Sequence, residues 1–452
     1  MAYIILIFSV FVLLSIKLIS DKFSRIVVFL AVIMWVTCVF LAACRVYDFF
    51  EINSTTYVYF ILSITMFMIG AISLNPLFRK TNFKYWDSPA FNIDSFDVDV
   101  VVNNKFFRYT FVISLVEILY LATTQWQVIV LQGGIGSLKI SMFELVFHNN
   151  SLLYFLYQAV CFPVFYLVLV IESILILQRK KKWVEITIFA VFIIAFCFVG
   201  GKRGYYSQSL MSFFFIFIFK YKQLINNRAS GVFKKKNVIK LAAVFCIAFY
   251  GASLTTSMYE DNGEGNVREA GQDLLRQVVS YKVGPLVAFD KALEKDYLST
   301  IGGYQFGRAT LGGAIDYYGC SILSMAGIKV KQVRDITMSP LQNNFIYVGT
   351  DNTMNFAYTS LIYFYFDLGF FGIIIFSFMF GMIVRYTVFY LKKKRTIGSV
   401  LLVNFMCLAC QSFFASWVNI ALYTQFVIVY AVILSKKEIA FRKRQLTLKA
   451  IN

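Results

Sequence analysis

The chain has 452 residues, of which 59% are hydrophobic and only 15% are charged, and its formal net charge is +19. A soluble domain cannot bury that much apolar surface, and apolar runs of about twenty residues, enough for a helix to cross a bilayer, recur along the chain. Lysine and arginine gather in short clusters between these runs, which is typical of membrane proteins and not of a nucleic-acid-binding surface. The composition therefore predicts an all-α polytopic integral membrane protein and excludes nucleic acid as its partner.

The predicted membrane spans number about eleven. In chain order they are 2–20, 26–44, 57–77, 109–131, 152–177, 184–200, 204–220, 240–257, 356–384, 397–417 and 419–435. The first run has no basic segment before it and no small-residue cleavage site, so we interpret it as a span and not as a signal peptide.

The basic clusters predict which loops face the cytoplasm. These clusters are 179–182, 234–236, 392–395 and 436–444. Their alternation along the chain predicts a cytoplasmic C-terminus and places the 198–208 turn and the long segment 258–355 on the periplasmic side.

This long outward segment divides the chain into three predicted parts. Residues 1–257 hold eight transmembrane helices, 258–355 form one large, partly helical periplasmic loop, and 356–452 hold three further helices and a basic cytoplasmic tail. The loop begins with apolar residues at helical spacing, and this helix is expected to break at Gly284-Pro285. The stretch GGYQFGRATLGGAIDYYG that follows is typical of a loop or re-entrant element that approaches a ligand.

The turn FVGGKRGYYSQ places Lys202 and Arg203 between two apolar runs. Each run is too short to cross a bilayer without including residues of the turn. Cations on the outer face run against the charge bias of membrane proteins, and flanking glycines allow close approach of a ligand. Arginine grips a phosphate with two parallel N–H groups, so the pair predicts capture of a phosphate or pyrophosphate. The alternative is a basic pair that only reaches to the lipid headgroups.

Three arginines of the large loop are expected to join Arg203 on the same anion: Arg268, Arg276 and Arg308. The alternative for each of them is an ordinary solvated face of the loop. If they do converge, their charges would stabilise negative charge that develops on a leaving group.

Four further residues are candidates for acid–base or structural roles. His148 and Asp351 face outward and are candidate general bases, although a lone loop histidine is more often a bystander. Asp367 and Glu117 lie within apolar runs, where an acid is a functional candidate unless it only hydrogen-bonds a neighbouring helix. One histidine excludes a multi-histidine metal site, and the cysteines indicate no disulfide framework and no metal site.

No nucleotide-binding, serine-hydrolase or metalloprotease motif occurs, so the substrate is expected to carry its own leaving group. Three stretches, GKRGYYSQ, LLRQVVSYKVGPLVAFDKAL and TMNFAYTSLIYFYFDLGFFGIIIFSFMFGMI, resemble the Wzy-type O-antigen or capsular polysaccharide polymerases. The last contains that family's pattern of an Asn, a Thr and a D-x-G-x-x-G in the helix after its major periplasmic loop.

The resemblance implies a glycosyltransferase of the bacterial inner membrane, with its active site facing the periplasm. It would join undecaprenyl-pyrophosphate-linked oligosaccharide repeat units, using one as donor and one as acceptor, without a cofactor or metal. Membrane lipid and a chain-length regulator protein would be its partners. Two alternatives stay open. A lipid-linked oligosaccharide flippase usually lacks such a large outer loop, and an O-antigen ligase is expected to show a clearer loop histidine than His148.

Overall fold

A computed structural model describes most of the chain. The described residues are 1–80, 96–131, 146, 150–178, 182–200, 203–226, 267–333, 335–337, 346–350, 353–354, 359–411 and 422–451. The helices of the first half are α1 (Ala2–Ser15), η1 (Ile16–Leu18), α2 (Lys22–Ala43), η2 (Val46–Asp48), α3 (Ser54–Ser73), α4 (Asn75–Lys80), α5 (Val98–Val102), α6 (Lys105–Leu131), α7 (Ser151–Leu156), η7 (Tyr157–Cys161), α8 (Phe162–Gln178), α9 (Trp183–Gly200) and α10 (Arg203–Asn226).

The second half is also mainly helical. Its elements are α12 (Val267–Glu294), α13 (Tyr297–Thr300), α14 (Arg308–Leu311), α15 (Gly313–Met325), β1 (Ile346–Tyr347), β2 (Thr353–Met354), α17 (Leu361–Lys394), α18 (Ile397–Gln411) and α20 (Leu422–Ile451). The two short strands pair antiparallel, with Ile346 opposite Met354 and Tyr347 opposite Thr353.

Five described helices are long and apolar enough to cross a membrane. They are Lys22–Ala43, Ser54–Arg79, Lys105–Gln127, Leu152–Gln178 and Leu361–Lys394. Shorter apolar helices occupy Ala2–Leu18, Trp183–Val199 and Ile397–Cys410. A mostly helical chain with helices able to cross a membrane is therefore confirmed. The predicted number of spans and their sidedness stay predictions, and the predicted span 240–257 lies outside the described residues.

The chain forms two compact units, each made of separate segments of sequence. The first comprises Met1–Asn82, Leu275–Tyr390 and Met406–Gln425, and the second comprises Phe83–Leu274, Leu391–Phe405 and Phe426–Asn452. Each unit is described by itself below.

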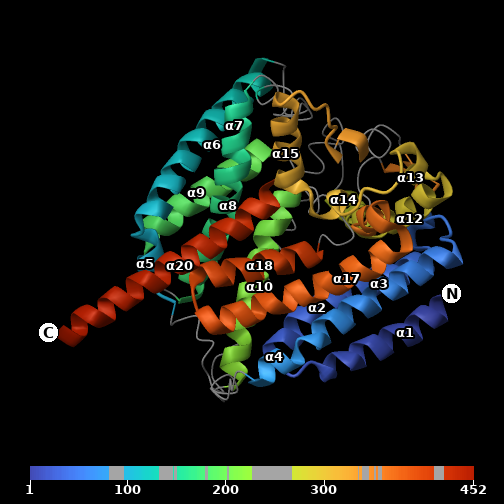
Figure 1. The fold of residues 1–452 in the computed structure, drawn as a ribbon, viewed down its shortest axis with the longest axis horizontal. Helices are drawn as coiled ribbons and strands as arrows, with labels where there is room; N and C mark the ends of the chain where they lie inside the picture. Colours follow the sequence, from blue (N-terminus) through green and yellow to red (C-terminus); the bar gives the residue numbers. More distant parts are fainter. Residues whose placement is uncertain are drawn as a thin grey trace. The chain divides into compact units, whose positions relative to one another are not determined.

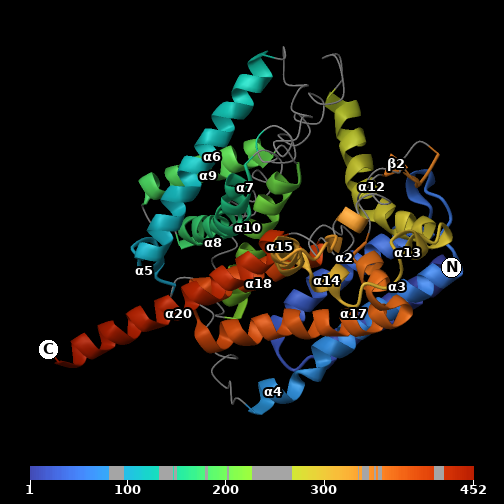
Figure 2. The same ribbon diagram turned by 45° about the horizontal axis from the view of Figure 1, so that its top comes forward.

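In the first unit, α1, α2 and α3 lie side by side with α17 (Figures 1 and 2). Small residues allow α3 and α17 to approach closely, because a Cβ atom on Gly70 would lie 2.0 Å from the carbonyl oxygen of Phe378. A Cβ atom on Gly381 would lie equally close, at 2.0 Å, to the carbonyl oxygen of Phe67. Neither glycine can therefore be replaced without moving the two helices apart.

In the second unit, α8 is the central helix, and most of its side chains are buried. It packs against α9 and α10, while α6 packs against α9 and against the π-helical turn η7 that precedes α8. The Tyr166 hydroxyl donates a hydrogen bond of 2.8 Å to Oε1 of Gln208, which joins α8 to α10. This unit is thus built around an almost wholly apolar helix that carries few polar contacts.

Helix α12 continues through Gly284 and Pro285, so the predicted break at this dipeptide is wrong. A proline inside a helix removes one N–H group and crowds the preceding turn, which is normally costly. Here every side chain from 283 to 290 is buried in the first unit. Burial of this face offsets the cost of the proline.

Candidate functional site

Helix α17 is interrupted in its first half, where the backbone leaves helical geometry at Leu368 (φ −146, ψ 22) and Gly369 (φ 60, ψ −137). The interruption frees carbonyl groups that an intact helix would satisfy. A loop of the segment between α13 and α14 pairs with them, and the N–H of Gln305 donates to the carbonyl of Phe366 at 2.9 Å. Non-helical backbone in an apolar helix requires such protein partners.

Asp367 fastens this loop to the interrupted helix. It is fully buried, and its two carboxyl oxygens accept N–H bonds from Ala309 (2.9 Å) and Thr310 (2.8 Å) in the short helix α14. Both donors are backbone groups at the start of a helix, which otherwise lack partners. The predicted buried acid therefore holds the loop through hydrogen bonds to backbone groups.

Glycine is required at position 369. Its φ of 60° lies in the left-handed region, and a Cβ atom there would lie 2.9 Å from the hydroxyl oxygen of Tyr304. The docked loop itself turns at Gly302, Gly303 and Gly307, all of which have φ between 85° and 93°. The glycine-rich composition of this stretch thus serves a tightly folded loop that docks into α17.

Arg308, a predicted anion ligand, lies at the start of α14 and is held by Asp316. Its Nε and Nη2 atoms contact Oδ1 of Asp316 at 2.9 and 2.8 Å, and Nη2 also donates to the carbonyl of Lys331 at 2.8 Å. The other oxygen, Oδ2 of Asp316, accepts the N–H of Val333 at 2.7 Å. The Arg308 side chain is 39% exposed, whereas that of Asp316 is 9% exposed. Asp316 and the carbonyl of Lys331 thus hold the Arg308 guanidinium in one orientation.

The other predicted anion ligands are only partly described. Arg276 is half-buried on α12, Arg268 lies in the first turn of the same helix, and Arg203 is the first residue of α10. The side chains of Arg203 and Arg268 are outside the described residues, as are Lys202, Asp351 and His148 altogether. Convergence of the arginines on one anion stays a prediction.

Glu117, the second predicted buried acid, lies in the middle of α6 and is 5% exposed. Its Oε2 atom accepts a hydrogen bond from the Cys161 thiol at 3.1 Å. Its Oε1 atom has no hydrogen-bond partner among the residues that the structure describes. The two buried acids therefore differ, because Asp367 is saturated with donors and Glu117 is not.

Sequence reasoning missed Asp290, which is 1% exposed on α12. It accepts hydrogen bonds from the backbone N–H of Asn53 (3.2 Å) and from the Thr56 hydroxyl (2.5 Å) at the start of α3. The next residue, Lys291, donates to Glu294 one turn further along and so lowers the pKa of that carboxyl. The signal in the sequence was an aspartate within the apolar face of an amphipathic helix.

Sequence reasoning also missed Arg385, which is fully buried on α17. Its guanidinium donates to the carbonyl of Ala71 and, at 3.0 Å, to the hydroxyl of Ser20, and it lies 4.5 Å from the ring centre of Phe78. The last carbonyls of a helix lack internal partners and favour a cation, so Arg385 closes the end of α3. A single arginine in a long apolar run was the available signal.

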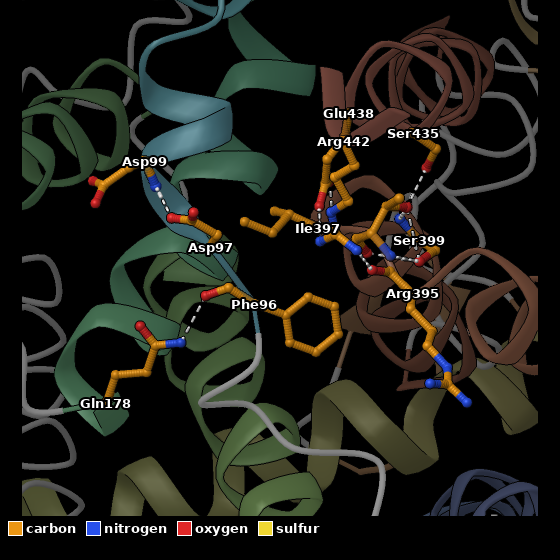
Figure 3. Close-up of polar contacts among 11 residues, drawn as sticks. Phe96, Asp97, Asp99, Gln178, Arg395, Ile397, Ser399, Ser435, Glu438 and Arg442 are labelled. Carbon is orange, nitrogen blue, oxygen red and sulfur yellow. Dashed lines mark hydrogen bonds and ion pairs between the residues drawn. The ribbon is translucent and has the colours of Figure 1, made fainter. Parts of the chain in front are cut away.

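A third missed cluster lies in the second unit, at the turn between α17 and α18 (Figure 3). Oε2 of Glu438 accepts the N–H of Ile397 at 2.8 Å, and Oε1 pairs with Arg442 at 2.5 Å. Arg442 also donates to the carbonyl of Arg395 at 3.1 Å. Burial raises the pKa of Glu438 to about 7, although Arg442 and the Ile397 N–H act in the opposite direction. The cluster fixes the start of α18 against α20.

Comparison of the chain with protein-family models, with curated proteins and with solved structures finds no significant match. The function is therefore argued from the residues of this chain. Of the predicted anion ligands, Arg308 in the docked loop has described hydrogen bonds and an ion pair that orient its side chain.

Proposed function

We propose that the chain is a membrane glycosyltransferase that joins polyprenyl-pyrophosphate-linked oligosaccharide repeat units into a polysaccharide at the periplasmic face of a bacterial inner membrane. The observation that carries this proposal is the loop docked into α17, which presents Arg308 in a fixed orientation on Asp316. An enzyme of this type needs positioned cations for the pyrophosphate and a loop anchored in a transmembrane helix. The resemblance of three stretches to the repeat-unit polymerases names the substrate class.

In the proposed reaction, a hydroxyl group of the acceptor oligosaccharide attacks the anomeric carbon of the donor glycan. A new glycosidic C–O bond forms, and the bond from that carbon to the pyrophosphate breaks. The departing polyprenyl pyrophosphate takes the bonding electron pair, so negative charge increases on its oxygens. Positioned guanidinium groups stabilise such charge without moving during the reaction.

Arginine side chains fill this role in the proposal, and the candidates are those predicted from the sequence: Arg203, Arg268, Arg276 and Arg308. The planar guanidinium matches two phosphate oxygens at once, which an ammonium group does not. The proton of the attacking hydroxyl passes to a base, for which Asp351 and His148 are the candidates. The activated substrate supplies the driving force, so no cofactor enters the proposal.

The membrane context of the proposal rests on the five helices that are long and apolar enough to cross a bilayer. A polyprenyl chain stays within the lipid, so the enzyme that uses it must act at the bilayer surface. The described segment 267–333 provides short helices and tight turns outside these five helices. A glycan would meet the carrier's pyrophosphate in such a setting.

The proposal is tested by deleting the gene from its host and analysing the surface glycans and lipid-linked intermediates. We expect single repeat units in place of the polysaccharide, with restoration of the polymer by the wild-type gene. Loss of every surface glycan would instead indicate a flippase. Accumulation of long polymer on the lipid carrier would indicate a ligase, and either result would overturn the proposal.

A further inference from the structure

Glu117 is a buried acid on α6. It takes no part in the docked loop described above, and no step of the proposed reaction uses it. Glu117 is 5% exposed, and its neighbours at helical spacing are also buried. These neighbours are Ser114, Ile118, Leu121 and Gln125. The carboxyl group thus points into the second unit, toward the π-helical turn η7, against which α6 packs.

The contacts of this carboxyl group do not suit a negative charge. Within the described residues, the thiol of Cys161, which is a weak donor, is its one hydrogen-bond partner, and Oε1 has none. In the part of the chain that the structure describes, the titratable groups that act on it are Cys161 and the buried Tyr157, both from η7, and neither carries positive charge. An ionised carboxylate in an apolar interior requires a cation or several strong donors, and the described surroundings of Glu117 provide neither.

Asp367 provides the comparison within the same chain. Each of its oxygens accepts a backbone N–H bond, so that acid is explained by the loop it holds. Glu117 does not fix a backbone segment in this way. Its described hydrogen bond joins it to the side chain of Cys161 and leaves Oε1 without a donor. A buried polar atom without a partner calls for a bound species or a functional role.

Two further observations point to the same place. The turn opposite Glu117 is π-helical over Tyr157–Cys161, and such turns occur frequently at functional sites in helices. On α6 itself, Oε1 of the buried Gln125 is also without a partner. The buried face of α6 therefore contains two oxygens, Oε1 of Glu117 and Oε1 of Gln125, that have no hydrogen-bond partner among the described residues.

We infer that Glu117 is a proton-binding site inside the helix bundle. The proton forms an O–H bond on Oε1, while Oε2 continues to accept the thiol hydrogen bond of Cys161. Release of the proton leaves a carboxylate that needs a new donor, so release requires a rearrangement at the η7 turn. This site does not depend on the proposed polymerase activity and stands if that activity is disproved.

The test is infrared spectroscopy of the purified full-length protein in lipid at neutral pH. Subtraction of the Glu117→Gln spectrum from the wild-type spectrum should reveal the C=O stretch of one protonated carboxyl group, and this band should shift in heavy water. Glu294→Gln is the matched control, because Glu294 is exposed and paired with Lys291. Its difference spectrum should contain carboxylate bands only.

Carboxylate bands in the Glu117→Gln difference spectrum would overturn the inference. A carboxylate signal that appears with sodium salts and not with choline salts would indicate that Glu117 binds an alkali cation instead of a proton. That result would also overturn the inference. If Glu117→Gln does not fold, Cys161→Ala supplies the second measurement. Removing the thiol donor should shift the protonated-carboxyl band of the protein, and an unchanged band would count against Glu117 as its source.

Discussion

The carboxylate of Asp367 accepts a hydrogen bond of 2.8 Å from the backbone N–H of Thr310, which lies 57 positions earlier in the chain. This bond and its companion to Ala309 join the loop before α15 to the interrupted helix α17. A proton taken up by Asp367 would weaken both bonds. The geometry therefore assigns Asp367 to positioning the loop that carries Arg308.

Asp367→Asn should destabilise the protein, because an amide has one accepting oxygen and faces two N–H donors. Loss of one such buried bond, with two donors opposed, is expected to cost about 1–3 kcal/mol. Thermal unfolding in detergent measures the effect, and the glycan ladder measures its consequence for activity. The exposed Asp335→Asn is the matched control. Equal stability of the two variants would contradict the positioning role.

Gly369→Ala should be more damaging than Gly302→Ala. Both glycines have positive φ, but a methyl group on Gly302 would meet no atom within 4 Å, whereas one on Gly369 would lie 2.9 Å from the Tyr304 hydroxyl. Left-handed backbone alone costs a non-glycine residue about 1–2 kcal/mol. Adding Tyr304→Ala should restore part of the stability of Gly369→Ala and none of that of Gly302→Ala. Unfolding temperatures of the four variants provide the comparison.

Arg308→Ala should reduce polymer formation by about 10²–10³-fold if Arg308 stabilises the departing pyrophosphate. Arg308→Lys should also be impaired, because lysine keeps the charge but cannot contact Asp316 and an anion together through a planar group. Lys329→Ala, which removes an exposed cation of the same segment, is the control. Glycan ladders are compared at equal membrane abundance. Wild-type ladders from Arg308→Ala would remove this residue from the site.

Arg203→Ala should yield only single-repeat product while the protein stays folded, because the residue lies at the start of α10 and a neutral residue is tolerated there. Arg203→Lys should be severely impaired, since it loses the two-pronged grip on phosphate oxygens. Lys202→Ala should be milder, because a point charge beside a retained arginine is partly redundant. A full-length ladder from Arg203→Ala would mean that this basic pair only contacts lipid headgroups.

The stability of the wild-type protein should fall as the pH rises from about 4.5 to about 7, through titration of Glu438. Burial raises the pKa of this carboxyl in the folded state, so the folded protein binds the proton more tightly than the unfolded chain does. The contribution is present in full below the unfolded pKa and is lost above the folded one. Unfolding of Glu438→Gln, measured across the same pH range, should lack this component, and identical pH profiles would contradict it.

The helices were predictable because apolar runs of sufficient length can satisfy their backbone in lipid only as helices. Asp367 also stood out in the sequence as an acid within such a run, and Gly369 belongs to the D-x-G-x-x-G pattern noted there. Their partners did not, because the bonds to Ala309 and Thr310 connect segments almost sixty positions apart, and neither segment's pattern specifies the other. The helix break predicted at Pro285 was wrong for a related reason. Burial in the tertiary structure offsets the cost of the proline, and local helix propensity does not include that burial.

The pairing of the loop with α17 also has a consequence for biosynthesis. Ala309 leaves the ribosome 58 residues before Asp367, its hydrogen-bond partner. At synthesis rates of about 5–20 residues per second, the glycine-rich loop waits roughly 3–12 seconds for the helix that completes it. During that interval its backbone N–H groups depend on water, or on a chaperone or translocon that shields them. The loop therefore gains these contacts only after Asp367 has been made, and slower translation just before Asp367 would lengthen its exposure.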